Sequence, residues 1–304
     1  MALSSPDSRC AHAQARVTDA ISRLLASDRD KLMAEFDATW YSAAGEVGTT
    51  DFMYALGDSV AAAVQYGHKA LLCSFYNGTL FGAADSDGSG PGLLSTPHAG
   101  SDEDEDWALA RIFANYTKHA WGPNYFRQCF YNSTCMRDAT RSGTAESARS
   151  WYFLKCSQLG YLQVGPPKGS LGTRPRQLDL PALLAQCSYI FGDELPLIDE
   201  ARVATFNAKV GGGAVGGVDR IFEVDFSDDP WKMATTAAAV QRASWPLSLG
   251  QPFTLATCDG CAHCGAGAPP ERLRAIEEQA AGWLEEWGVI KMKINGTARL
   301  RPAR

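Results

Sequence analysis

Helical periodicity in the first part of the chain is the strongest constraint on its fold. Apolar residues recur at helical spacing from Cys10 to about Tyr66, beginning with Val17, Ile21 and Leu24. Residues that recur every three or four positions share one face of a helix, which must be buried against another element. The pattern therefore predicts three or four packed helices over this stretch.

The segment 82–106 interrupts that pattern. It is rich in Gly, Ser, Pro and acidic residues and nearly free of large apolar ones. Because such a segment buries too little apolar surface to offset the entropy of ordering it, we predict a disordered surface loop. Its acidic end, 102–106, is expected to be a solvated run preceding a helix that begins near Trp107.

After about residue 145 the pattern changes. Aromatic and β-branched runs alternate with helical ones, which is typical of an α/β arrangement. We therefore expect a helical domain at 1–145 and an α/β domain at 146–304. Within the latter, 219–226 is predicted to form a buried strand and 252–258 a second strand. The segment 269–287 is predicted to be a helix whose apolar stripe lies in the core.

Charge and hydropathy exclude two classes of partner. The net charge is −6, and Lys and Arg are scattered instead of forming the basic stripe that binds phosphates. No apolar stretch reaches the roughly 18 to 20 residues that cross a bilayer. We expect neither a nucleic-acid partner nor a membrane span.

Two features indicate the secretory pathway. Four of the six Asn residues begin an Asn-x-Ser/Thr sequon, namely Asn77, Asn115, Asn132 and Asn295. The nine Cys residues suit disulfides better than a reduced core. Because the first residues do not resemble a signal peptide, we expect the signal to lie upstream of Met1. The alternative is a cytosolic protein with chance sequons.

Asp229 and His263 are the best candidates for chemistry. Each follows a predicted strand, where reactive side chains gather in open α/β sheets. In α/β-hydrolases the catalytic residues run serine, acid, histidine along the chain, and Asp229 followed 34 residues later by His263 matches the last two steps. A carboxylate holds an imidazole in one tautomer and supports its charge. On spacing alone, this pair is a hypothesis.

The chain from residue 145 onward resembles a known family on five motifs. They are RSWYFLKCSQLGYLQ at 149–163, LLAQCSYIFG at 183–192, FNAKVGG at 206–212, DFSDDPW at 225–231 and CAHC at 261–264. These motifs resemble the serine carboxypeptidase family that includes lysosomal Pro-Xaa carboxypeptidase, dipeptidyl peptidase II and thymus-specific serine protease. Tyr54 to Gly67 also resembles that family's helical insertion.

The resemblance implies a fold and an activity. The fold would be the C-terminal part of an α/β-hydrolase domain at 146–304, preceded by a helical cap domain at 1–145. Asp229 would be the acid and His263 the base of a serine exopeptidase that needs no cofactor or metal. Its substrate would be a short, proline-containing peptide, its compartment lysosomal, vacuolar or extracellular, and it could form a homodimer.

The resemblance also implies disulfide pairings. Cys10 would pair with Cys73, and Cys156 with Cys187. The odd ninth Cys would have a partner upstream of Met1.

The chain departs from the family pattern at three places. Asp225 and Phe226 stand where the family has Asn-Gly, and Ala266 where it has Asp. The sequence also contains no Gly-x-Ser-x-Gly nucleophile motif. Its nearest approach, around Ser59, lies in a helical pattern, so we predict that Ser59 is structural. We expect this chain to be a truncated product that is inactive as written.

Two other functions compete with this one. Cys258, Cys261, His263 and Cys264 could be zinc ligands, although such tight spacing rarely closes a tetrahedron. Alternatively, the chain is a non-catalytic secreted glycoprotein or binding module of hydrolase fold. The missing serine favours this second alternative, and the presence of Asp229 and His263 opposes it.

Overall fold

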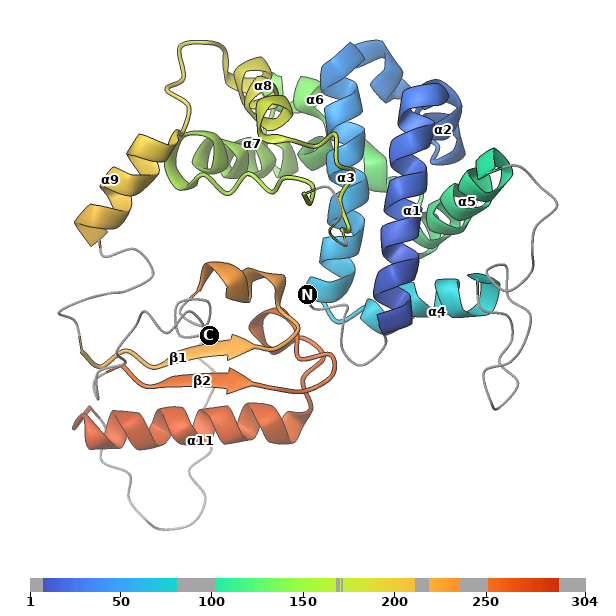
Figure 1. Cartoon of the computed structure of the whole chain (residues 1–304). Helices are drawn as coiled ribbons and strands as arrows, with labels where there is room; N and C mark the ends of the chain where they lie inside the picture. The colour runs from blue at the N-terminus through green and yellow to red at the C-terminus, as the bar shows by residue number, and fades with distance from the viewer. Residues whose placement is uncertain are drawn as a thin grey trace. The chain divides into compact units, whose positions relative to one another are not determined.

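The computed structural model describes residues 8–80, 102–167, 170, 172–210, 219–235 and 251–289. It is mostly helical with a small sheet, and the chain divides into two compact units, Met1–Gly212 and Gly213–Arg304 (Figure 1). Within the described ranges, no helix combines the length and apolar character needed to cross a bilayer.

The described part of the first unit is built from helices. In chain order they are α1 Ser8–Ser27, α2 Arg29–Glu35, α3 Gly45–Gln65, α4 Lys69–Leu80, α5 Asp102–Trp121, α6 Ser133–Arg137, α7 Thr144–Leu154, α8 Leu180–Phe191 and α9 Glu200–Val210. Short 3-10 segments at Thr39–Ala44, Tyr125–Arg127 and Cys129–Tyr131 and a π-helical turn at Lys155–Leu159 lie between them. The helices predicted between Cys10 and Tyr66 are confirmed.

Aromatic side chains form the centre of this helical core. The ring of Phe36, at the end of α2, meets the rings of Phe52, Phe113 and Phe126 edge-on, with centroids 5.5, 6.0 and 5.7 Å apart. All four side chains are buried. Edge-to-face contacts place the positive edge of one ring against the negative face of another. Phe36 therefore ties α2 to α3, α5 and the 3-10 segment that contains Phe126.

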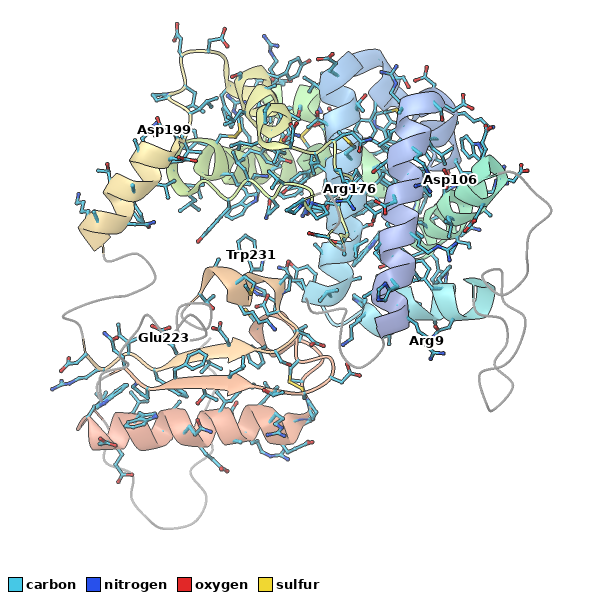
Figure 2. The ribbon with its side chains drawn as sticks, in the orientation of Figure 1. Arg9, Asp106, Arg176, Asp199, Glu223 and Trp231 are labelled. Atoms are coloured by element: carbon cyan, nitrogen blue, oxygen red, sulfur yellow. A yellow bond between two sulfur atoms is a disulfide. The ribbon has the colours of Figure 1, made fainter. Side chains whose placement is uncertain are left out.

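The acidic run at 102–106, predicted to be part of a solvated loop, is instead the first turn of α5. Asp106, labelled in Figure 2, is only 6% exposed. Its two oxygens accept hydrogen bonds from Arg23 of α1 at 2.7 and 2.6 Å. Glu105 pairs with Arg16, also on α1. The prediction failed because these arginines lie more than 80 residues away in sequence. Residues 82–101 lie outside the described residues.

Residues 146–210 are part of the helical unit, whereas the sequence predicted a boundary at residue 145. The described part of this stretch forms α7, the π-helical turn, α8 and α9, without a strand. Contacts divide the chain after Gly212. Buried Tyr152 shows the reason, because its ring lies 6.0 Å from that of Tyr54 on α3. The aromatic segment around Tyr152 thus lies in α7 and packs against α3, and it does not form a strand.

Two buried cations extend this packing. Lys155, 1% exposed, donates a hydrogen bond to the Tyr54 hydroxyl at 2.9 Å and lies over the faces of the Tyr54 and Tyr152 rings. Arg174 pairs with Asp58 of α3 at 2.6 Å. Burial lowers the pKa of Lys155 to about 7; Asp58 opposes this shift and Arg174 reinforces it.

A second buried polar centre lies around Asp51 of α3. Its carboxylate accepts hydrogen bonds from the amide and hydroxyl of Ser133, at 2.8 and 2.6 Å, and from the Gln186 amide at 2.7 Å. Burial raises its pKa to about 6, although these bonds favour the charged form. The side chain thereby connects α3 to α6 and α8.

Ser59, the nearest approach to a nucleophile motif, lies inside α3. It is 0% exposed, and its hydroxyl donates to the carbonyl of Leu56 at 2.8 Å. A nucleophile elbow requires a strand-to-helix turn, which is not present within this continuous helix. The prediction that Ser59 is structural is confirmed.

Three disulfides lie in the described part of the helical unit. Cys10–Cys73 joins α1 to α4, and Cys156–Cys187 joins the π-helical turn to α8. These are the two pairings that the family resemblance implied. A third, Cys129–Cys135, joins a 3-10 segment to α6.

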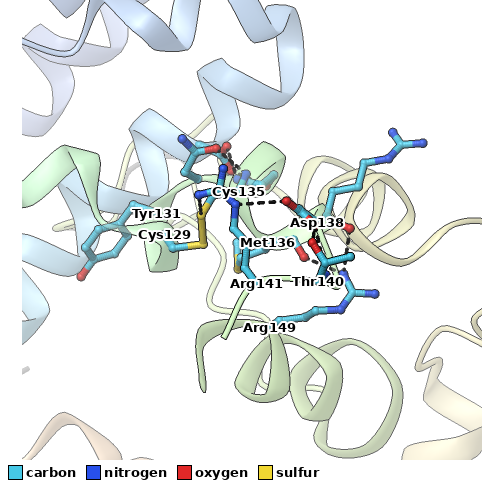
Figure 3. The surroundings of a disulfide bond; sticks show 12 residues. Cys129, Tyr131, Cys135, Met136, Asp138, Thr140, Arg141 and Arg149 are labelled. Atoms are coloured by element: carbon cyan, nitrogen blue, oxygen red, sulfur yellow. Dashed lines mark hydrogen bonds and ion pairs between the residues drawn. A yellow bond between two sulfur atoms is a disulfide. The ribbon is translucent and has the colours of Figure 1, made fainter. Parts of the chain in front are cut away.

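Polar contacts surround this third disulfide (Figure 3). A guanidinium nitrogen of Arg141 lies 3.4 Å from the Cys135 sulfur, and its Nε donates to Asp138 at 3.2 Å. Arg149 donates to the carbonyl of Met136 at 2.6 Å. These bonds hold the connection between α6 and α7.

The second unit contains a small parallel sheet. Strands β1, Glu223–Phe226, and β2, Phe253–Ala256, pair in register from Glu223 opposite Phe253 to Phe226 opposite Ala256. Both predicted strands are present but shorter. The residues of β1 are half-buried instead of buried, because only β2 pairs with it among the described residues.

Helix α11, Pro270–Glu286, lies alongside β2 (Figure 1). It confirms the helix predicted at 269–287. Its apolar stripe was predicted to lie in the core, but no residue of α11 is buried and Leu284 is 37% exposed. The sheet has two strands in the described ranges, which cover too little of the helix to bury the stripe. The sequence further predicts a helix that reaches about residue 242 and a short hairpin formed by VIKMKI followed by Asn295-Gly296, and both extend into residues outside the described ones.

Buried Lys155 predicts a pH-dependent stability. The unfolded chain keeps the lysine proton up to a pKa of about 10.5, whereas the folded chain releases it near 7. The free energy of unfolding should therefore rise between pH 7 and 10, by up to about 1.4 kcal/mol per pH unit. In Lys155→Met this rise should disappear and stability at pH 6 should increase, as measured by urea unfolding. The exposed-site control Lys209→Met should keep the wild-type slope; an unchanged slope in Lys155→Met would refute the interpretation.

Candidate functional site

The parallel pairing of β1 and β2 brings two loops to one edge of the sheet. The carboxyl ends of parallel strands point the same way, so the segments that follow them begin side by side. Asp229 follows the last residue of β1 by three positions, and His263 follows that of β2 by seven. The structure thus places both predicted residues on the loops where we expected them.

The two side chains meet. His263 Nδ1 lies 2.7 Å from Asp229 Oδ2. The carboxylate side chain is 10% exposed and the imidazole 36% exposed. In the neutral ring, a hydrogen on Nδ1 that is donated to Asp229 leaves the lone pair on Nε2. This is the arrangement in which a carboxylate orients an imidazole base.

Asp229 is held by the start of a short helix. It precedes the 3-10 segment Pro230–Ala234, and its Oδ1 accepts the backbone N–H of Trp231 at 2.9 Å. Its own N–H donates to the carbonyl of Phe226 at 3.1 Å. Pro230 fits the first helical position because it has no N–H to satisfy. Oδ1 is thus used in positioning, while Oδ2 faces the imidazole.

His263 is held in a tight turn. Its carbonyl accepts the N–H of Ala266 at 3.0 Å, and the Ala262 N–H donates to the Ala266 carbonyl at 2.9 Å. Cys264 and Gly265 have positive φ, 53° and 83°. A Cβ added at Gly265 would lie 2.8 Å from a methyl carbon of Leu273 on α11. This close approach seats the turn on the helix.

Ser227 and Asp228 connect the acid loop to the base loop. The Ser227 hydroxyl donates to the carbonyl of Cys258 at 2.9 Å and accepts its N–H at 3.3 Å. Asp228 Oδ2 accepts the N–H of Gly260 at 2.8 Å, and its own N–H donates to the carbonyl of Cys261 at 2.8 Å. Because Asp228 is 6% exposed, water competes little for these bonds.

This connection was not predicted from the sequence. In the sequence, Ser227 and Asp228 stand out only as members of the motif DFSDDPW. The pairing of their side chains with backbone groups 31 and 32 residues away leaves no periodic or compositional signal. Only the juxtaposition of the two strand ends reveals it.

The cysteines of the base loop bear on the zinc alternative. Cys258 is bonded to Cys261, while Cys264 is a free, exposed thiol. A disulfide withdraws two of the four proposed ligands. Within the described ranges, no group of three or more His, Cys, Asp or Glu residues is arranged to hold a metal.

The predicted glycosylation sites fall in different environments. Asn77 on α4 and Asn115 on α5 are exposed. Asn132 is half-buried, and its side chain caps α6 by accepting the N–H of Cys135 at 2.9 Å. Asn295 lies outside the described residues.

Chemically, the described part of the site offers a carboxylate–imidazole pair. Such a pair can take a proton from a hydroxyl or water and return it to a leaving group. The sequence contains no Gly-x-Ser-x-Gly motif that would supply the hydroxyl.

Comparison with known proteins identifies two relatives. The chain is 27% identical over 215 residues to a probable serine protease, EDA2, from Arabidopsis thaliana, a match that covers 70% of this chain and 36% of the plant protein. It is 30% identical over 162 residues to a probable extracellular serine carboxypeptidase from Arthroderma benhamiae, covering 49% of this chain and 22% of the fungal protein. No protein-family model matches the chain.

The chain is thus a distant homologue of proteins named as serine-type peptidases, and it matches about a third or less of their length. The disulfides of the structure, together with a relative named as extracellular, are consistent with the secretory pathway.

The contact between His263 and Asp229 predicts a spectroscopic signal. An imidazole N–H that donates to a buried carboxylate is shielded from water and should give a downfield proton resonance. We expect proton NMR of this chain to show that resonance, and we expect it to disappear in His263→Gln and in Asp229→Ala. His119→Gln, a change in the helical unit, should leave it intact. Survival of the signal in Asp229→Ala would contradict the pairing.

Proposed function

We propose that this chain is part of a serine-type exopeptidase in which Asp229 and His263 are the acid and the base of a catalytic triad. One observation carries the proposal: His263 Nδ1 lies 2.7 Å from Asp229 Oδ2. The residues come from loops after two parallel strands, in the order that α/β-hydrolases use. The homology to two serine-type peptidases supports this interpretation over that of an incidental pair.

The mechanism would be acyl transfer. A catalytic serine would attack the peptide carbonyl while His263 takes the hydroxyl proton. Two backbone N–H groups would stabilise the oxyanion. The imidazolium, supported by Asp229, would then protonate the leaving amine. In the second half of the reaction, His263 would take a proton from water, which attacks and releases the acyl group, and would return that proton to the serine.

The two units have distinct roles in this proposal. The second unit would be the C-terminal part of an α/β-hydrolase sheet, since its strands are parallel and carry the candidate residues at their carboxyl ends. The helical unit would be the cap inserted in that fold, and its extent would then be 1–212 instead of 1–145.

The substrate and compartment follow from the family resemblance. Substrates would be short peptides with proline next to the scissile bond, and no cofactor would take part. The enzyme would act in a lysosome, a vacuole or outside the cell, with glycans on Asn77, Asn115, Asn132 and Asn295. A homodimer is compatible with this proposal.

A second candidate is a non-catalytic secreted glycoprotein of hydrolase fold. The absence of a Gly-x-Ser-x-Gly motif from the sequence favours it. In such a module the Asp229–His263 contact would serve only to join the two loops.

Kinetics of the natural protein distinguish the two candidates. The protein would be expressed from its native transcript and assayed on short proline-containing peptides. We expect His263→Ala to lower kcat/KM by about 10² to 10⁴-fold through lost general acid–base catalysis. Asp229→Ala should lower it through misorientation of the imidazole, and the control His119→Ala should keep the wild-type rate. Normal turnover in His263→Ala would refute the enzymatic role, and the absence of turnover in the wild type would support the non-catalytic candidate.

A further inference from the structure

Three cysteines around His263 form two overlapping Cys-x-x-Cys motifs that share Cys261. The first, Cys258-Asp-Gly-Cys261, is oxidised in the structure, with its Cα atoms 5.2 Å apart. The second, Cys261-Ala-His-Cys264, has the same spacing and encloses His263. A disulfide across this spacing is already formed within this loop, so the spacing itself does not prevent the second pairing.

The exposure of the three cysteine residues is graded. Cys261 is 0% exposed, Cys258 is half-buried, and Cys264 is exposed and unbonded to another cysteine. Thiol–disulfide exchange requires an accessible thiol, and Cys264 is accessible and lies three residues from Cys261 in the sequence. Cys264 also lies at φ 53°, a left-handed conformation that is unfavourable for a side chain other than glycine. A rearranged loop could release that strain.

The Cys258–Cys261 disulfide closes a small ring of residues 258–261. Several backbone groups of this ring form hydrogen bonds with Ser227 and Asp228, in the loop that carries Asp229. The N–H and carbonyl of Cys258 bind the Ser227 hydroxyl, the Gly260 N–H binds Asp228, and the Cys261 carbonyl accepts the Asp228 N–H. The Cys258–Cys261 bond holds these acceptors and donors in one small ring. Its rearrangement would therefore disturb the loop that positions Asp229 as well as the one that carries His263.

We propose that Cys258, Cys261 and Cys264 form a thiol–disulfide exchange site that controls the alignment of His263 with Asp229. Cys264 loses its proton to solvent, and its thiolate attacks the Cys261 sulfur. The Cys261–Cys264 bond forms as the Cys258–Cys261 bond breaks, and Cys258 leaves as a thiolate that takes up a proton. The reaction is an isomerisation that requires no oxidant or reductant.

Small thiols of the glutathione class would react at the same site. Their thiolate would attack the half-buried Cys258, forming a mixed disulfide with Cys258 and releasing Cys261 as a thiolate. The effect on catalysis rests on the proposed function, whereas the exchange itself does not. The Cys261–Cys264 isomer and the mixed disulfide both lack the Cys258–Cys261 bond. Each therefore opens the ring of residues that Ser227 and Asp228 contact through hydrogen bonds.

Disulfide mapping of the full chain tests the exchange. In fresh protein, iodoacetamide should alkylate Cys264. After equilibration in a glutathione redox buffer at mildly alkaline pH, we expect peptides linked through Cys261–Cys264 and alkylation at Cys258. The buried Cys156–Cys187 bond of the helical unit is an internal reference. Because access governs the rate of exchange, it should react at about one tenth of the rate of the Cys258–Cys261 bond, or more slowly still.

Two variants test the consequence for the pair. Cys264→Ser cannot exchange internally and should keep both the Cys258–Cys261 bond and the downfield imidazole resonance. In the same glutathione redox buffer, where oxidised glutathione takes up the two electrons, Cys258→Ser should form Cys261–Cys264 and lose that resonance.

The proposal would be overturned if equilibrated wild-type protein contained only Cys258–Cys261, or if Cys258→Ser formed the new bond and kept the resonance. The wild-type mapping decides the case even if Cys258→Ser does not fold. Neither readout depends on peptidase activity, so failure of this proposal is distinguishable from failure of the enzymatic one.

Discussion

The hydrogen bond between His263 and Asp229 depends on the parallel register of two short strands. That register sets both loops at one edge of the sheet, and Ser227 and Asp228 then fasten the acid loop to backbone groups of Cys258, Gly260 and Cys261. The contact between His263 and Asp229 thus depends on a network of hydrogen bonds that holds the two loops together. Such pre-organisation is what an acid–base pair requires, because catalysis loses efficiency when a reacting group is misplaced by about 1 Å.

The helical unit shows a different use of polar groups. Asp51 and Lys155 are buried, and burial moves the pKa of each toward neutrality, to about 6 and about 7. Each makes hydrogen bonds that cross between elements, so each specifies how those elements pack. Neither residue takes part in the proposed chemistry; both illustrate that a perturbed pKa can report structure as readily as function.

Elements with local signals were predictable, and those that depend on distant partners were not. Helical spacing identified the helices before Tyr66 and α11, and the buried setting of Ser59 followed from its place in a helical pattern. The acidic run at 102–106 was misassigned because its partners Arg16 and Arg23 lie on another helix. The contact between Asp229 and His263 was predictable because their places after two strands and the family motifs around them carry that signal, whereas Ser227 and Asp228 act through backbone groups that leave none.

The proposed roles of Asp229 and His263 both depend on a catalytic serine. The most direct test is to isolate the natural protein, label it with a fluorophosphonate probe, which requires an activated serine, and map the modified peptide. We expect one labelled serine, in a polypeptide that also yields the peptides containing Asp229 and His263, and loss of labelling after Asp229→Ala. A folded natural protein that has its disulfides intact and takes up no probe would refute the catalytic role of Asp229 and His263.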